Sequence, residues 1–207
     1  MIWYKVIIAL ILAYLIGSFQ TSVWVCRTFK HINIREHGSG NPGATNVMRV
    51  CGLKLGFLVL FLDALKGAVS VLMVRYGFDC DNVAIQLLSG AACVLGHNYP
   101  YYMDFKGGKG VAATLGIALA INWKVFLIAG FPALFALLVT RIMSTASLTF
   151  GILLFVAFIA FYASSGNVIW IALTAAFYPV MMIYRHKENL RRLINHEEKP
   201  LWEWKKK

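Results

Sequence analysis

The chain has 207 residues, of which 59% are apolar, and a formal net charge of +11. Its length allows a single domain, and its mean hydropathy of +0.68 argues against a soluble one. In a soluble protein the positive charge would indicate nucleic-acid binding. Here the charges flank long apolar runs, which favours membrane orientation and contact with anionic headgroups, so we expect membrane lipids and no nucleic acid as partners.

Seven apolar segments follow one another along the chain and predict an all-α integral membrane protein with about seven transmembrane helices. The first segment, 6–25, is uncharged and long enough to cross a bilayer core of about 30 Å. The third and fourth are short, so a re-entrant pair remains an alternative to two full spans. The other six segments are 55–74, 83–95, 111–121, 125–139, 146–161 and 168–184.

The lysines and arginines predict the orientation. If the N-terminus is outside, all 20 of them except Lys5, Lys66, Arg75 and Lys124 fall on the cytoplasmic side. Because cytoplasmic loops are enriched in these residues, we expect the N-terminus outside and the C-terminus inside. Residues 1–207 form one polytopic domain in this interpretation, with a body over 1–198 and a basic, tryptophan-containing tail over 199–207.

A polar, glycine-rich stretch at 37–49 interrupts the apolar pattern. Its three glycines and Pro42 exclude a regular helix or strand through its first half. Backbone amides freed by glycine, together with the planar donor fork of Arg49, are suited to a phosphate group. A helix that begins near Ala44 would point its free N–H groups at the same place. The alternative is a polar turn between two membrane helices.

A second polar stretch contains Gly96 and His97 and continues to Lys106-Gly107-Gly108-Lys109-Gly110. Glycines around a lysine again suit a phosphate group. A nucleotide-binding P-loop is excluded because Gly110 follows Lys109 where that motif requires Ser or Thr, and no strand is expected before it. A tight turn between short helices is the alternative.

Two further stretches complete the polar set on the expected cytoplasmic side. Arg141 and Ser144 lie in 140–147, which is weak evidence taken alone. In 184–194, His186 and Asn189 are three residues apart and share one side of a predicted amphipathic helix. That helix is also expected to lie along the membrane surface, and Trp202 in the tail is expected to anchor at the interface.

Asp63 and Lys66 lie one helical turn apart inside the second apolar segment. Charges inside a membrane are costly and are either functional or paired with each other, and we favour a structural ion pair. The four cysteines show no metal-binding spacing, so no metal or cofactor is expected.

Taken together, the polar motifs resemble the bacterial glycerol-3-phosphate acyltransferases that use acyl phosphate, the PlsY family. Six motifs match in the same order, and the resemblance extends from the first apolar segment to about Glu198. The motifs are 38–49, 63–67, 96–100, 107–112, 141–147 and 186–193.

The resemblance implies an all-helical, seven-span enzyme of the bacterial inner membrane with a cytoplasmic active site. It implies transfer of a fatty acyl group from acyl phosphate to the 1-hydroxyl of glycerol 3-phosphate, which gives lysophosphatidic acid and phosphate. We expect a monomer. The residues implied in catalysis are Ser39, Arg49, Lys109, His186 and Asn189. Those implied in substrate binding are Gly38, Gly40, Asn41, Thr45, Asn46, Gly107, Gly108, Gly110 and Ser144.

The chain departs from the family pattern at two places. Ala113 stands where the family has threonine, with Thr114 next to it, and His196 stands where the family has glycine before a late glutamate, here Glu198. The rival functional class is a small transporter of phosphate or organic anions, which glycine-rich breaks near apolar spans would also fit. Against it, the cations cluster on one side of the membrane rather than at mid-membrane.

Overall fold

The computed structural model describes residues 3–201, and every regular element in that range is helical, which confirms the all-α prediction. Tail residues Trp202 and Trp204 lie outside the described residues. The α-helices are α1 (Trp3–Ser18), α2 (Thr21–Lys30), α3 (Ala44–Cys51), α4 (Leu53–Leu72), α5 (Val83–Asn98), α6 (Val111–Ile121), α7 (Trp123–Thr140), α8 (Met143–Phe161), α9 (Val168–Arg185) and α10 (Lys187–Ile194). A 3-10 turn, Ile34–Glu36, precedes α3, and a π-helix, Met73–Gly77, continues α4.

Each of the seven apolar segments is helical, apart from a break of two residues in the first. Within residues 3–201, five continuous stretches are long and apolar enough to cross a membrane, and they are Trp3–Lys30, Leu53–Gly77, Trp123–Thr140, Met143–Phe161 and Val168–Arg185. The helices α5 and α6 are also apolar but shorter, at 16 and 11 residues. The chain is therefore an integral membrane protein, and a count of seven full spans stays a prediction.

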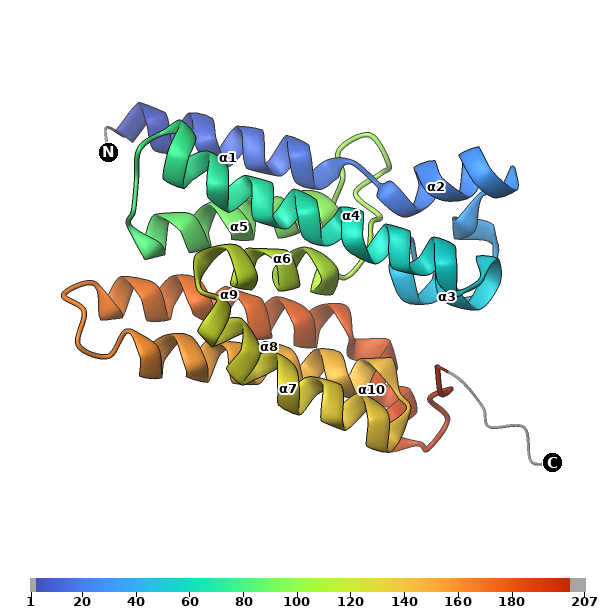
Figure 1. Cartoon of the computed structure of the whole chain (residues 1–207). Coiled ribbons are helices and arrows are strands. Elements are labelled where there is room, and N and C mark those ends of the chain that lie inside the picture. The colour runs from blue at the N-terminus through green and yellow to red at the C-terminus, as the bar shows by residue number, and fades with distance from the viewer. Residues whose placement is uncertain (1–2, 202–207) are drawn as a thin grey trace.

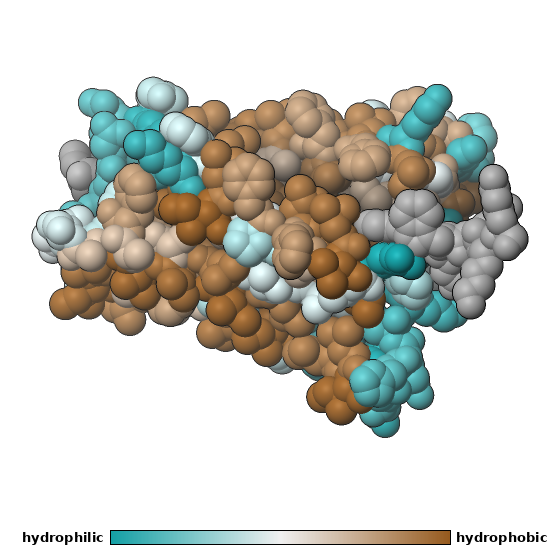
Figure 2. Space-filling view, turned by 60° about the horizontal axis from the view of Figure 1, so that its bottom comes forward, coloured by the Kyte–Doolittle hydropathy of each residue, from teal (hydrophilic) through white to brown (hydrophobic). Residues whose placement is uncertain are grey.

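The long helices run side by side in two layers (Figure 1). One layer contains α1, α4 and α5, the other contains α7, α8 and α9, and α6 lies between them. The short helices α2, α3 and α10 gather at one end of the bundle, opposite the described N-terminal end of α1. The face formed by the second layer is largely apolar, and hydrophilic residues are concentrated toward the two ends (Figure 2). This distribution fits a bundle that crosses a membrane along its long axis.

Glycines allow two helix pairs to pack backbone against backbone. On the interface of α1 with α5, a Cβ atom at Gly17 would lie 1.9 Å from the Cys93 carbonyl oxygen. On the interface of α4 with α6, a Cβ atom at Gly116 would lie 1.7 Å from the Ala64 oxygen. Small residues at such crossings increase van der Waals contact where no hydrophobic effect drives helices together. The first interface holds α1 against α5, and the second holds α6 against α4.

The first span is not the continuous helix predicted over 6–25. The backbone leaves the helical conformation at Phe19 and Gln20 and resumes at Thr21. The pair expected within α4 lies at this break: Lys66 Nζ is 2.8 Å from Asp63 Oδ1 and donates to the Phe19 carbonyl oxygen at 2.9 Å. Asp63 also accepts from the Thr21 hydroxyl at 2.7 Å. The ion pair is thus present as expected, and it replaces the hydrogen bonds that the broken helix loses.

Candidate active site

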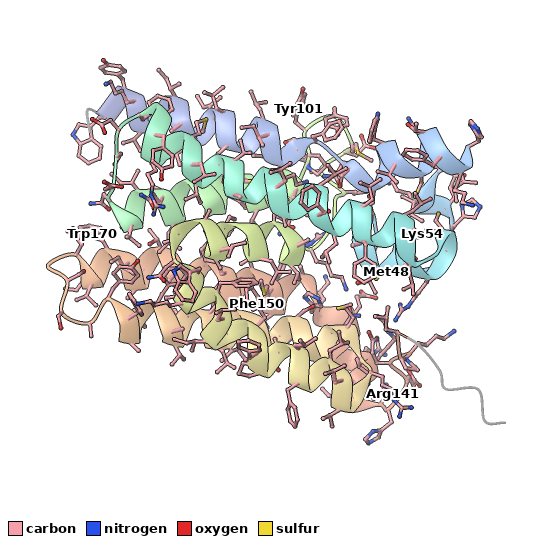
Figure 3. The ribbon with its side chains drawn as sticks, viewed as in Figure 1. Met48, Lys54, Tyr101, Arg141, Phe150 and Trp170 are labelled. Atoms are coloured by element: carbon pink, nitrogen blue, oxygen red, sulfur yellow. The ribbon has the colours of Figure 1, made fainter. Side chains whose placement is uncertain are left out.

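The polar stretches surround one cavity of about 1220 Å³. Its polar end is formed by the loop before α3, the loop before α6, the start of α8, α10 and the segment 198–201 that follows α10. Lys54 and Arg141 lie at this end of the bundle in Figure 3, and Trp170 lies at the opposite end. The polar residues that line the cavity are Arg35, Ser39, Asn41, Thr45, Asn46, Arg49, Asp63, His97, Lys106, Lys109, Ser144, Ser147, Tyr184, Arg185, His186, Lys187, Glu188, Asn189, Arg192 and Glu198.

The loop before α3 is shaped by a buried amide. Asn46 is 1% exposed, and its Oδ1 atom accepts from the Ser39 backbone amide at 2.9 Å. Its Nδ2 atom donates to the carbonyl oxygens of His37 at 2.9 Å and Ile34 at 3.3 Å. These bonds engage the polar atoms of Asn46, which also lines the cavity, and its role in substrate binding stays a prediction. Ser39 and Asn41 lie on the cavity side of this loop.

Arg49 lies in the last turn of α3, with its guanidinium directed across the mouth of the cavity. Its Nη2 atom donates to the carbonyl oxygen of Lys199 at 3.0 Å, which ties the segment after α10 to α3. The helix begins at Ala44, as the sequence predicted, and Gly43, Ala44 and Thr45 line the cavity. Backbone N–H groups at the start of a helix and a nearby guanidinium together favour a bound anion.

Lys109 extends from the glycine loop, residues 106–110, toward α10 and donates to Asn189 Oδ1. Burial lowers the pKa of Lys109 to about 8. Glu198 opposes this shift, whereas Arg192, Arg185 and Arg49 reinforce it. At neutral pH the amine is still charged, but it holds its proton weakly because so many cations share one partly dry site. An incoming phosphate would relieve this repulsion.

His186 lies between α9 and α10 and is 3% exposed. Its Nδ1 atom is 2.8 Å from the Met182 carbonyl oxygen, so Nδ1 carries the proton and donates. Burial lowers the pKa of His186 to about 4, and the charge of Lys109 acts in the same direction. The imidazole is therefore neutral at physiological pH, and its Nε2 atom is a hydrogen-bond acceptor.

Glu198 joins α8 and α10 at the polar end through three side chains. Its carboxylate accepts from Asn189 at 2.6 Å, from Arg192 at 2.6 Å and from the Ser144 hydroxyl at 3.1 Å. Burial opposes ionisation of this carboxyl group, but the three hydrogen bonds outweigh burial and lower its pKa. The late glutamate that the sequence resemblance indicated is therefore ionised, and it orients Asn189 and with it Lys109.

The structure brings most of the predicted site residues to the cavity and separates a few from it. Gly38 and Gly108 do not line it. A Cβ atom on Gly38, which has a φ of 62°, would lie 2.3 Å from Asn46 Oδ1, so this glycine serves the loop fold. Thr114 beside Ala113 donates to the Gly110 carbonyl oxygen at 2.9 Å, and it too is absent from the lining.

Three cavity-lining arginines, Arg35, Arg185 and Arg192, were not assigned to the site from the sequence. Arg35 and Arg185 had been counted only as charges on the cytoplasmic side, and Arg192 also lies in the motif 186–193 without an assigned role. The one signal that could have found Arg185 is its place beside His186. Arg192 could have been found by its helical spacing from Asn189, which places both on one side of α10.

An apolar arm of the cavity runs away from the polar end. On α7 the lining extends from Phe126 to Leu138, a rise of about 18 Å at about 1.5 Å per residue. Phe150 of α8 lines the arm and contacts Phe126 edge to face, with ring centroids 6.4 Å apart. Figure 3 shows Phe150 in the interior, away from the end marked by Arg141. Lining residues such as Phe57 of α4 and Phe131 of α7 are also exposed on the outer surface, so the lining of the arm reaches that surface on both helices.

The family model described as glycerol-3-phosphate acyltransferase matches residues 7–196. The chain belongs to the glycerol-3-phosphate acyltransferase family. This match covers the cavity residues of both glycine-rich loops and of α10, and it confirms the family that the sequence motifs indicated.

Individual relatives agree with this membership. The glycerol-3-phosphate acyltransferase of Lactiplantibacillus plantarum is 41% identical over 94% of this chain and 91% of its own length. That of Syntrophotalea carbinolica is 44% identical over 92% and 95%. The crystal structure of PlsY (YgiH), an integral membrane glycerol 3-phosphate acyltransferase in its glycerol 3-phosphate form, superposes with a TM-score of 0.85 at 38% identity over 95% of each chain. Its lysophosphatidic acid form superposes with a TM-score of 0.83 at 37% identity over 95% of each chain.

Proposed function

We propose that this membrane enzyme transfers a fatty acyl group from acyl phosphate to the 1-hydroxyl of glycerol 3-phosphate, which gives lysophosphatidic acid and phosphate. The observation that carries the proposal is a single cavity with a cationic polar end and an apolar arm. Both substrates present a phosphate, and only one also carries a long apolar chain. If the substrate were only a soluble anion, no part of it would occupy the apolar arm.

The polar end holds the two phosphates in this proposal. Lys109 and Arg49 are donors on its opposite sides. We assign Ser39 to the acyl phosphate or its leaving group, because its side chain is at the cavity edge and only weakly engaged, accepting from the Asn41 amide at 3.4 Å. Ser144 acts indirectly through Glu198.

The apolar arm holds the acyl chain. An extended chain advances about 1.3 Å per methylene, because C–C bonds of about 1.5 Å zigzag, so about 18 Å accommodates roughly 14 carbons. We propose that the chain enters from the bilayer between α4 and α7 and that the product returns to it the same way. Leu134, 50% exposed and in the lining, lies on this route.

The transfer itself needs no covalent enzyme intermediate. The hydroxyl oxygen of glycerol 3-phosphate attacks the acyl carbon, the bond from that carbon to the phosphate oxygen breaks, and phosphate leaves with the electron pair. The proton of the hydroxyl passes to a substrate phosphate oxygen, whose second pKa is near 6. Arg49 and Lys109 stabilise the charge that grows on the leaving phosphate.

His186 is assigned to positioning rather than proton abstraction. An imidazole with a pKa of about 4 is a weak base at neutral pH, and general bases work best when their pKa is near the working pH. Its unprotonated Nε2 atom can still accept a hydrogen bond from the attacking hydroxyl and so orient it. Asn189 holds Lys109 in place by accepting its hydrogen bond.

The orientation and context follow from the charges. We propose seven spans in the bacterial inner membrane, with the polar end of the cavity in the cytoplasm, where both phosphorylated substrates are found. The body of the enzyme is residues 1–198, and the monomer contains the whole cavity, so we propose that it acts without a partner chain.

A liposome assay tests the function against the transporter alternative. Purified protein is reconstituted and supplied with labelled glycerol 3-phosphate, with and without acyl phosphate. We expect label in the lipid extract only when acyl phosphate is present, and no transfer when acyl-CoA or acylated carrier protein replaces it. Water-soluble label that accumulates inside the vesicles without any lipid-extractable product would contradict the proposal and favour transport.

A further inference from the structure

The last residues of α5 hold the backbone of the glycine loop that carries Lys109. The Gly107 amide donates to the Asn98 carbonyl oxygen at 3.0 Å, and the Gly108 amide donates to the His97 carbonyl oxygen at 3.1 Å. Gly108 rests on the imidazole of His97, where a Cβ atom would lie 2.1 Å from Nε2. The amides of both glycines therefore face α5, and their carbonyl groups point to the other side.

One guanidinium binds those carbonyl groups. The Nη2 atom of Arg185 donates to the oxygens of Gly107 and Gly108, each at 2.8 Å, and its Nε atom donates to Gly108 at 3.1 Å. The Tyr99 ring lies against the same group, with the guanidinium carbon 5.1 Å from its centroid. Arg185 is half-buried in this position, and its planar fork matches two consecutive carbonyls in a way that a lysine cannot.

Arg185 is also the residue before His186. The loop that carries Lys109 and the turn that carries His186 come from distant parts of the chain, and Arg185 joins them through three hydrogen bonds and no intermediate residue. Arg185 is the last residue of α9, a helix of 18 residues, so its backbone is rigidly placed. Movement of the loop relative to α9 would break all three bonds together.

We propose that Arg185 is a positioning residue that sets the placement of Lys109 relative to His186 during acyl transfer. It acts through the loop and does not itself hold substrate. This inference rests on the proposed function, because its effect is read in the acyl-transfer rate. A displacement of about 1 Å in a catalytic group can cost about 10²-fold in rate, so a loosened loop is expected to reduce turnover strongly.

Arg185→Lys removes the planar guanidinium and its several donors but keeps the positive charge. We expect kcat to fall at least tenfold, with the KM for acyl phosphate within about twofold of wild type, because the apolar arm is untouched. In Arg185→Ala, added methylguanidinium should restore kcat several-fold, and methylammonium should not. Arg191→Lys, at an exposed position on α10 outside the cavity lining, is the matched control and should keep wild-type rates.

The possible outcomes distinguish a failure of the proposed function from a failure of the positioning role of Arg185. Absence of transfer by the wild-type protein in the same vesicles would refute the proposed function. Wild-type transfer together with a wild-type kcat in Arg185→Lys, or equal rescue by both cations, would refute the positioning role. If Arg185→Lys does not fold in detergent, Tyr99→Leu decides, since removing the ring should lower kcat several-fold without changing the KM for acyl phosphate. An unchanged kcat in that variant then overturns the inference.

Discussion

Replacing Lys109 by arginine is expected to change how activity depends on pH. The pKa of Lys109 is about 8, well below the ordinary value of 10.5, because the amine is buried among cations. A cation with a lowered pKa loses its charge as the pH rises through that value. At pH 9, one unit above it, about one tenth of the free enzyme keeps the ammonium group, so kcat/KM for glycerol 3-phosphate should fall about tenfold from its plateau near pH 7.

Arginine stays protonated throughout this range, so Lys109→Arg should show a flat profile to about pH 10, at a lower plateau. The measurement is the initial rate of lysophosphatidic acid formation from labelled glycerol 3-phosphate at subsaturating concentration. The substrate phosphate, with a second pKa near 6, is already about nine tenths ionised at pH 7, so its titration adds little to the change across this range. Lys54→Arg, an exposed change at the same end, should leave the fall in place. A wild-type kcat/KM that is constant from pH 7.5 to 10 would refute the reasoning.

Four further predictions follow from the cavity. Arg49→Lys should lose at least about tenfold in kcat/KM, because a point charge replaces a two-donor fork, and normal kinetics for both substrates would leave Arg49 as an orientation charge only. His186→Gln should keep measurable turnover and the shape of its pH profile, whereas a loss of kcat above about 10³-fold with binding intact would make His186 the base. Phe150→Val should lengthen the arm and favour acyl chains two carbons longer by up to about 15-fold at about 0.8 kcal/mol per methylene, and an unchanged chain-length ratio would contradict this. In a cysteine-free background, Ser164→Cys should label in intact cells and Lys54→Cys only after permeabilisation, and the reverse would overturn the orientation.

The sequence predicted the helices well because the membrane restricts the options. An apolar run that must satisfy its own backbone can only be helical, so the extents of α7, α8 and α9 followed from composition. The break at Phe19 could not be predicted, because it depends on bonds from Lys66 and Asp63, more than 40 positions away. Local pattern contains no information on such contacts.

The site residues were predictable where residues close together in the sequence form a recognisable anion-binding motif. Glycines beside Lys109 and small polar residues before Arg49 predicted anion-binding loops, and both line the cavity. Arg185 was missed because its partners are backbone carbonyls, which leave no trace in side-chain patterns. Glu198 was placed in the site only by resemblance, since its role depends on a segment that folds back over α10 and Ser144.

Burial determines which groups at the polar end are protonated. Burial lowers the pKa of both Lys109 and His186, so the lysine binds its proton weakly and the histidine binds none at neutral pH. A site of this kind provides positive charge but no good base. Phosphate substrates provide the opposite, since they bring negative charge and oxygens with a pKa near 6. Binding them strengthens the hold of Lys109 on its proton through favourable pairing and places a base beside the hydroxyl. The enzyme therefore needs to supply only geometry and charge, which is what Arg185, Asn189 and Glu198 are arranged to maintain.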